Sequence, residues 1–279
     1  MIMSTELPKG ITHQDDVEPE TRERWHQSVR DATLAMLDHC MRYVCPISHV
    51  ITNDEGELEG TGAYIEWGGK RLLITNEHVL KDFKQRKFAH QFFHCEDVFE
   101  LADPVALETH PVDVAICPIA EDLWRSRHHA AEAVPQARFA SRHCPVPGDL
   151  MFVTGFPQHR SRFVFGNLCS RATRLVTQEA PVAPVHNLHP NYFIVAYAPE
   201  KTQSVDLANA VPLSTPEGMS GSLVWNTRFV ECRAAGKPWS PDMAQVTGMF
   251  CRWDSSTSSV LAVRIEVIRD FLQRHVPTI

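Results

Sequence analysis

The sequence lacks any apolar run long enough to cross a membrane, and its first eight residues have neither the basic start nor the hydrophobic core of a secretory leader. It also lacks an excess of basic residues: 27 Lys and Arg stand against 34 Asp and Glu, a net charge of −7. This balance argues against a surface that follows a phosphate backbone. We therefore expect a soluble cytoplasmic protein that binds neither a membrane nor nucleic acid.

The eight cysteines form no C-x-x-C pair, and most lie in apolar, strand-like segments. This spacing favours free thiols in a reducing compartment. His90, His94 and Cys95 have a spacing that could suggest a metal site, but no fourth ligand has a convincing spacing. We interpret them as a surface loop or strand edge and treat His186 and His189 with the same caution. The sequence predicts no metal and no cofactor.

The chain is expected to begin with a mobile polar segment, residues 1–18, followed by an N-terminal helix over residues 19–42. Acidic residues and a proline near the start of the helix favour this assignment. Apolar residues recur at three- or four-residue spacing, namely Trp25, Val29, Ala32, Met36, Cys40 and Tyr43. Such a stripe most often packs on its own domain, and a docking face for a partner is the minority alternative.

The rest of the chain predicts a mainly β protein. Short strands and turns alternate from residue 43 to about 124 and again from about 148, separated by a proline-containing connection over about 125–147. A chain of 279 residues is long enough to bury the core of two such units. A last helix is expected over residues 263–275, with apolar residues along one side.

Three short motifs place a histidine, an aspartate and a serine in that order: TNEHV around His78, VDVAI around Asp113 and GMSGS around Ser220. Acyl transfer needs a hydroxyl activated by an imidazole, a carboxylate that orients the imidazole, and N–H groups for the oxyanion. Each motif alone is more often structural, so the interpretation depends on their joint order. The alternative is the G-x-S-x-G nucleophile elbow of the α/β-hydrolases, which needs glycine at its last position and an acid and then a histidine downstream. Here Ser222 occupies that position, and His275 is the only histidine after Ser220, so the alternative fails.

Together with Gly60-Thr61-Gly62 and Gly155-Phe156-Pro157, these motifs resemble the trypsin-like serine peptidases. The branch without disulfides, which includes the bacterial HtrA-type proteases, is the most similar, over about residues 43–276. The resemblance implies two packed antiparallel six-stranded β-barrels of chymotrypsin type, at about 43–124 and 148–279, with the two helices at the ends. Because the predicted last helix ends at residue 275, we expect no PDZ module of the kind that HtrA-type proteases carry.

The resemblance also implies a role for each motif residue. Ser220 would be the nucleophile, His78 the general base and Asp113 the group that orients it, with the N–H groups of Gly218 and Ser220 as the oxyanion hole. Met219 replaces the aspartate that captures a new N-terminus in secreted relatives, so we expect that activation switch to be missing. The protein would be active as made or controlled by a regulatory protein partner.

For the substrate, the resemblance places Ser214 at the floor of the S1 pocket and Glu217 at its entrance. Cys251, Arg252 and Trp253 would pair with the substrate backbone. With no carboxylate at the floor, small or neutral apolar P1 residues are favoured over Lys and Arg. The expected function is a serine endopeptidase that cuts a limited set of protein substrates. The alternative is a catalytically silent binding module on the same fold.

Overall fold

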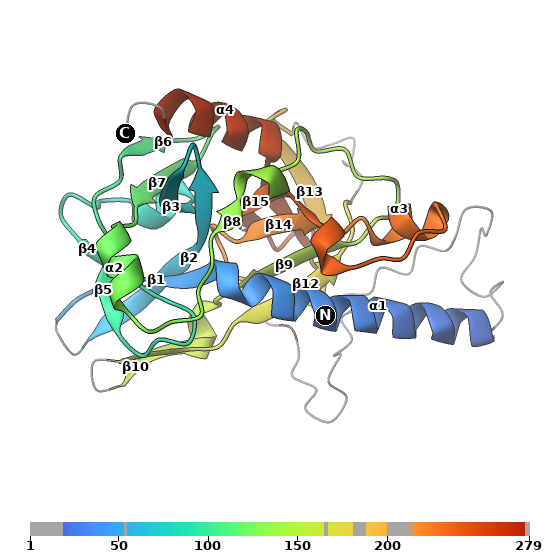
Figure 1. Cartoon of the computed structure of the whole chain (residues 1–279), viewed down its shortest axis with the longest axis horizontal. Helices are drawn as coiled ribbons and strands as arrows, with labels where there is room; N and C mark the ends of the chain where they lie inside the picture. The colour runs from blue at the N-terminus through green and yellow to red at the C-terminus, as the bar shows by residue number, and fades with distance from the viewer. Residues whose placement is uncertain are drawn as a thin grey trace.

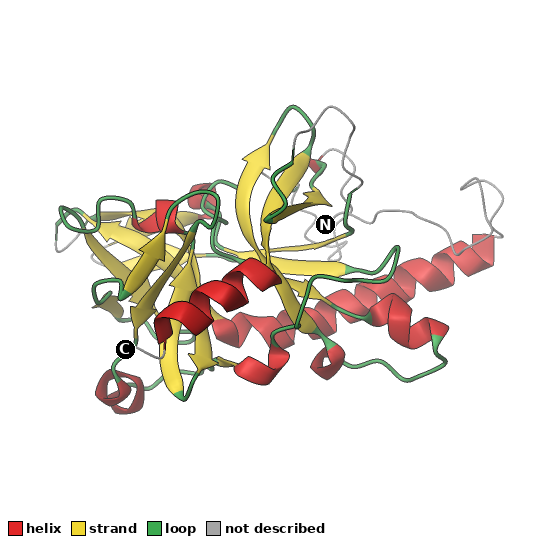
Figure 2. Cartoon of the chain, turned by 90° about the horizontal axis from the view of Figure 1, so that it is seen from above, coloured by secondary structure: helices red, strands yellow, loops and turns green. Residues whose placement is uncertain are grey.

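The structure is a computed structural model of the 279-residue chain. It describes residues 19–52, 55–164, 167–180, 188–199, 213 and 215–276. The expected mobile segment 1–18, His186 and Ser214 lie outside these residues. Two curled β-sheets lie side by side, a long helix runs along one side of them and a second helix packs near the C-terminus (Figures 1 and 2).

The first sheet has the strand order β5-β4-β1-β2-β3-β7-β6, and β8 adds to β2 as its one parallel member. The tight hairpin between β2 and β3 uses Gly68 and Gly69, which both have positive φ as a two-residue turn of this kind requires. The strands are β1 (Val44–Val50), β2 (Gly56–Trp67), β3 (Lys70–Thr75), β4 (Lys87–Gln91), β5 (Val98–Glu100), β6 (Ala106–Glu108), β7 (Val114–Pro118) and β8 (Val134–Pro135).

The second sheet has the order β12-β9-β14-β15-β16-β13 and is antiparallel throughout. It closes into a barrel because Glu179, just after β12, bridges Val195 of β13. A separate hairpin, β10–β11, lies against β2. The strands are β9 (Met151–Gly155), β10 (Ser161–Val164), β11 (Asn167–Ser170), β12 (Thr173–Thr177), β13 (Tyr192–Ala196), β14 (Leu223–Asn226), β15 (Gln245–Asp254) and β16 (Ser259–Arg264).

The predicted mainly β architecture, with two antiparallel units and a helix at each end, is confirmed. The second barrel has the six expected strands, whereas the first sheet has eight. The added strand β8 falls in the stretch expected to connect the barrels, so part of that connection completes the first sheet. The 3-10 turns are η2 (Met41–Tyr43), η3 (Glu77–Leu80), η4 (Gln136–Arg138), η5 (Gln158–Arg160) and η7 (Pro241–Met243).

The two long helices pack on the largest core, which draws side chains from both sheets. Helix α1 (Pro19–Cys40) buries the predicted stripe from Val29 to Cys40, and Trp25 contacts Phe229 with ring centroids 6.0 Å apart. Helix α4 (Ile265–His275) buries Ile265, Ile268, Phe271 and Leu272. The short helices are α2 (Glu121–Ser126) and α3 (Phe229–Ala234). The α1 stripe therefore packs on the protein's own core.

All eight cysteines lie in described parts of the chain and none forms a disulfide. In those same parts no helix is long and apolar enough to cross a membrane.

The interpretation of His90 as part of a surface loop or strand edge is wrong, because β4 lies between β5 and β1 and the residue is buried. His90 lies in β4 with 1% of its surface exposed, and its Nδ1 is 2.8 Å from the hydroxyl of Tyr64. Its neighbour His94 is exposed and stacks on Phe93. Because burial disfavours the charged imidazolium, the pKa of His90 falls from 6.5 to about 4.

This burial predicts a loss of stability in mild acid. At a pH between 6.5, the pKa in the unfolded chain, and about 4, the pKa in the folded protein, His90 is protonated in the unfolded chain and neutral in the folded protein. The stabilisation by neutral His90 is therefore complete above pH 6.5 and is lost as the pH falls towards 4, by up to about 3 kcal/mol. Urea unfolding at several pH values should show a flatter pH dependence for His90→Gln than for the wild type. The exposed control His94→Gln should follow the wild type, and equal slopes for His90→Gln and wild type would contradict the assignment.

Candidate active site

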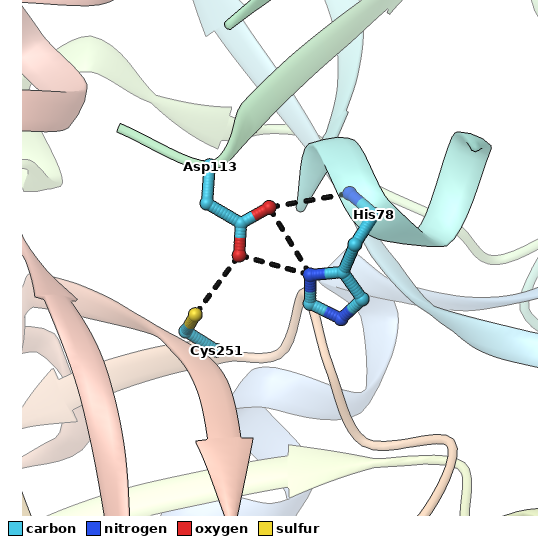
Figure 3. Close-up of side chains that lie close together, drawn as sticks. All are labelled: His78, Asp113 and Cys251. Atoms are coloured by element: carbon cyan, nitrogen blue, oxygen red, sulfur yellow. Dashed lines mark hydrogen bonds and ion pairs between the residues drawn. The ribbon is translucent and has the colours of Figure 1, made fainter. Parts of the chain in front are cut away.

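His78 and Asp113 meet at one end of the first sheet, because β3 and β7 are antiparallel neighbours in which Thr75 pairs with Ala115. His78 follows β3 on the 3-10 turn η3, and Asp113 directly precedes β7. The His78 Nδ1 atom is 2.9 and 3.1 Å from the two carboxylate oxygens, and the His78 backbone N–H also donates to Asp113 (Figure 3). The Asn76 side chain holds the Asp113 backbone carbonyl at 2.9 Å. The His78 ring, the His78 backbone N–H and the Asn76 side chain together hold Asp113 in place.

Asp113 is buried, yet its carboxyl remains acidic. Burial acts to raise its pKa, but the hydrogen bonds and charge of His78 and the thiol of Cys251 outweigh burial and leave the pKa below its ordinary value of 3.8. The residue also has φ +50°, a left-handed conformation that costs about 1–3 kcal/mol for a side chain of this kind. A buried carboxylate in strained backbone is typical of a functional position.

The carboxylate sets the tautomer of His78. With Nδ1 facing Asp113, a neutral imidazole carries its proton on Nδ1 and offers a lone pair on Nε2. The His78 side chain is 44% exposed, and its Nε2 has no hydrogen-bond partner among the residues that the structure describes. The arrangement can therefore accept a proton from a group that approaches through the open side.

Cys251 makes a third contact with the pair: its Sγ lies 2.9 Å from Asp113 Oδ2 (Figure 3). Burial and the nearby Asp113 charge raise the pKa of the thiol, so it stays protonated and donates to the carboxylate. Within the described ranges, His78, Asp113 and Cys251 are the one group whose potential metal-ligand atoms lie within 4.8 Å of one another. In this arrangement the Cys251 thiol donates to the Asp113 carboxylate, so the three groups form a hydrogen-bond network.

Ser220 lies next to this network through Cys251. Its hydroxyl donates to the Cys251 backbone carbonyl at 3.1 Å. Among the described contacts there is no hydrogen bond between Ser220 and His78. His78 and Cys251 therefore both contact Asp113 directly, and Ser220 is joined to this group through its hydrogen bond to Cys251.

The loop that carries Ser220 requires glycine at two positions. Gly218 and Gly221 have φ values of +90° and +91°, and a Cβ at Gly221 would come within 2.0 Å of the Thr61 carbonyl oxygen. A Cβ at Gly218 would meet the backbone of Phe156 at 2.7 Å. The backbone N–H groups of Gly218 and Ser220 have no acceptor in the part of the chain that is described.

Thr61 joins the Ser220 loop to the first sheet. Its N–H donates to the Ser220 carbonyl at 2.8 Å, and its hydroxyl donates to the Gly218 carbonyl at 2.9 Å. The same hydroxyl accepts the N–H of Phe156 at 2.9 Å, so three loop and strand segments meet at one buried side chain. Sequence reasoning missed this role, although a threonine between two glycines at the start of the apolar stretch Ala63-Tyr64-Ile65 was a visible signal.

The other predicted substrate residues lie in different surroundings. Ser214 is outside the described residues. Glu217 is exposed, and its backbone carbonyl accepts the N–H of Gln158 at 2.8 Å. Arg252 is exposed, whereas Trp253 is partly buried with its ring centroid 6.3 Å from that of Tyr197. Met219 is fully buried in the second barrel.

The sequence matches a family model described as a trypsin-like peptidase domain over residues 60–229. No curated protein matches it. Among solved structures it is similar to the inactive form of a serine-to-alanine mutant of Rv3671c from M. tuberculosis H37Rv, with 16% identity, a TM-score of 0.49 and coverage of 87% of this chain and 91% of that chain. It is also similar to the active form of the Rv3671c protease, with 14% identity, a TM-score of 0.48 and coverage of 86% and 83%.

The contacts of Thr61 predict that removal of its hydroxyl damages both stability and the Ser220 loop. Thr61→Val keeps the shape but leaves the Gly218 carbonyl and the Phe156 N–H unpaired, which costs about 1–3 kcal/mol for each buried group. We expect a decrease in the free energy of unfolding of about 2–6 kcal/mol, measured by urea unfolding. Thr61→Ser, which keeps the hydroxyl, is the matched control. Equal stability of the Val and Ser variants would show that the hydroxyl does not hold the loop.

Proposed function

The chain belongs to the trypsin-like peptidase domain family, and from that premise we propose that it is a serine endopeptidase that hydrolyses peptide bonds through His78, Asp113 and Ser220. The observation that carries this proposal is the His78–Asp113 contact, with Nδ1 held at 2.9 Å by a buried, acidic carboxylate. Burial and a left-handed backbone both cost free energy at Asp113, and a role in orienting the general base would explain why the residue is kept there.

In the proposed reaction the Ser220 oxygen attacks the peptide carbonyl carbon while His78 Nε2 takes the hydroxyl proton. The imidazolium then gives that proton to the leaving amine, and an acyl-enzyme remains. Water attacks the acyl carbon, His78 takes a proton from it, and Ser220 is released with its proton restored. Asp113 stabilises the imidazolium without itself taking a proton. The N–H groups of Gly218 and Ser220, which have no acceptor among the described residues, would stabilise the oxyanion.

The hydrogen bond of Ser220 to Cys251 supports a version of this function in which substrate completes the site. A substrate strand that lies along Cys251 would offer its own N–H to the Cys251 carbonyl and compete with the Ser220 hydroxyl for it. Release of the hydroxyl would make it available to His78. The same contact favours the alternative function, a silent binding module, if the hydroxyl never leaves the carbonyl.

Two finer points of the proposal concern substrate choice and control. We retain the preference for small or neutral apolar P1 residues, which depends on Ser214 at the pocket floor. Glu217 at the rim is exposed, so its attraction for a basic side chain is worth under about 1 kcal/mol. A regulatory protein partner remains part of the proposal because Met219 is buried among apolar residues and offers no carboxylate for a new N-terminus.

The decisive test is reaction with a fluorophosphonate probe together with turnover of a casein or peptide-library substrate. Ser220→Ala should lose labelling, and Ser220→Ala and His78→Ala should each lose nearly all turnover while thermal unfolding is unchanged. Asp113→Asn should lose on the order of 10⁴ in turnover, because the wrong tautomer is presented. Ser256→Ala, on an exposed turn, is the matched control. Labelling of Ser220→Ala equal to the wild type, or no labelling of the wild type, would contradict the proposal.

We further propose that the protein works in the cytoplasm, supported by the eight free cysteines, five of them buried. Thiol titration of protein denatured without reductant should give eight reactive groups for each chain. Dithiothreitol should leave the free energy of unfolding of the native protein unchanged. Two or more disulfides found by mass mapping of protein purified with its thiols blocked at lysis would contradict the assignment.

A further inference from the structure

Among the described residues, one edge of strand β15 has no partner strand beside Ser220. Its pairing with β14 ends at Met249, and the last contacts on that side join Phe250 to Gly221 and Ser222 of the serine loop. Residues 252–254 remain paired only with β16 in the part of the chain that the structure describes. An extended peptide can add to such an edge through main-chain hydrogen bonds. That this peptide is a substrate, and that its residues can be numbered from the bond that is cut, rests on the proposed function.

A bulge in β15 determines which side chains face the peptide. The register with β16 shifts between Phe250 and Arg252, so that Cys251 is the extra residue. Arg252 pairs with Leu261, which in turn pairs with Ile194 of β13. Since Ile194 and Tyr192 are two residues apart on one strand, Arg252 lies on the same face of the barrel as Tyr192. Arg252 is exposed and has no ion-pair partner among the described residues.

Two histidines surround Tyr192 on this face. The His110 ring stacks on Tyr192 with centroids 5.9 Å apart, and the His189 ring lies 6.0 Å from Tyr192 and 6.2 Å from His110. Both histidines are exposed, although they come from different barrels. The Tyr192 hydroxyl is buried and has no hydrogen-bond partner among the described groups. Burial raises the pKa of Tyr192; Cys251 and Asp113 act in the same direction, and the charge of Arg252 opposes them.

The described carboxylates near this cluster already accept hydrogen bonds, including Asp254, which lies two residues after Arg252 on the same face of β15 and accepts from Ser256. Asp113 is held by His78 and Cys251, and Glu108 is bound by Arg274 and His275. The surface formed by Arg252, His110 and His189 therefore presents a permanent positive charge and two imidazoles that can donate hydrogen bonds. A carboxylate is the side chain that this combination would bind best, because a guanidinium can hold it with two parallel hydrogen bonds.

The register assigns this surface to particular substrate positions. Ser220 contacts the Cys251 carbonyl, so the substrate residue opposite Cys251 is P1, the residue whose bond is cut. The next residue towards the substrate N-terminus, P2, lies opposite Arg252 and shares its face, and P4 follows on that face by alternation. We propose that Arg252, with His110 and His189, selects substrates with Asp or Glu at P2 or P4. Arg252 is thus a specificity-determining residue.

The test is a cleavage profile on a peptide library in which P2 and P4 vary independently. The wild type should cleave peptides with Asp or Glu at P2 or P4 about 3- to 10-fold more efficiently in kcat/KM than those with Asn or Gln. Arg252→Glu should abolish this preference and favour Lys or Arg at the same positions, whereas Arg252→Lys should keep a weaker preference for acids. Lys237→Glu, the same charge reversal on the loop after α3, should leave the profile unchanged. An unaltered profile in Arg252→Glu, or a wild-type profile indifferent to charge at P2 and P4, would overturn the inference.

A binding measurement separates this inference from the proposed activity. Ser220→Ala protein is titrated by fluorescence anisotropy with labelled pools of ten-residue peptides that carry Glu, Gln or Lys at alternating positions. We expect the Glu pool to bind at least 3-fold more tightly than the Gln pool, and this difference to vanish when Arg252→Glu is added. If the wild type cleaves nothing but the Glu pool still binds through Arg252, the peptidase proposal fails and the acidic-peptide site stands. Equal binding of the three pools overturns the site.

Discussion

The site depends on the hydrogen bonds by which Thr61 of the first sheet holds the serine loop of the second. His78 and Asp113 both come from the first sheet, where the β3–β7 register fixes their spacing. Ser220 comes from the loop before β14, and its position relative to them depends on how the two barrels dock. Thr61 receives that loop through its N–H and its hydroxyl, and the close approach of Gly221 to the Thr61 carbonyl leaves no room for any side chain. The position of Ser220 relative to His78 and Asp113 therefore depends on these contacts of Thr61.

The second requirement is a charge that is buried and still ionised. An isolated carboxylate would become neutral in the protein interior, because the loss of hydration is worth several kcal/mol. Asp113 avoids this through donors from two barrels: the His78 ring and backbone N–H on one side and the Cys251 thiol on the other. The network therefore also joins the barrels. A change in their docking would therefore change the pKa of Asp113, because it would alter the donors that keep this carboxyl ionised.

Much of the fold and of the site could be predicted from the sequence because the signals were local. The period of α1, the two-glycine turn and the three short motifs each occupy a few adjacent residues, and the structure brings His78 to Asp113 and Ser220 to Cys251. What could not be predicted depends on contacts between distant residues. The role of Thr61 needs the Ser220 loop 159 residues away in the chain. The burial of His90 follows from an aromatic cluster that includes Tyr64 and Phe92, which no local pattern reveals. Strand β8 pairs through only two residues, too few for any periodicity.

The bulge in β15 shows how one backbone irregularity can serve several tasks. In a regular strand Cys251 would face opposite to both its neighbours, and Arg252 and Phe250 would share the barrel interior. With one extra residue, Phe250 and Trp253 remain with the second core, while Cys251 turns to Asp113 and Arg252 reaches the outer face beside the open edge. Three consecutive positions thereby acquire three surroundings: the carboxylate, the solvent-exposed edge and the barrel interior. Without the bulge Cys251 would still face away from the barrel interior, but Arg252 would turn into it, so the charge at the substrate edge depends on this one extra residue.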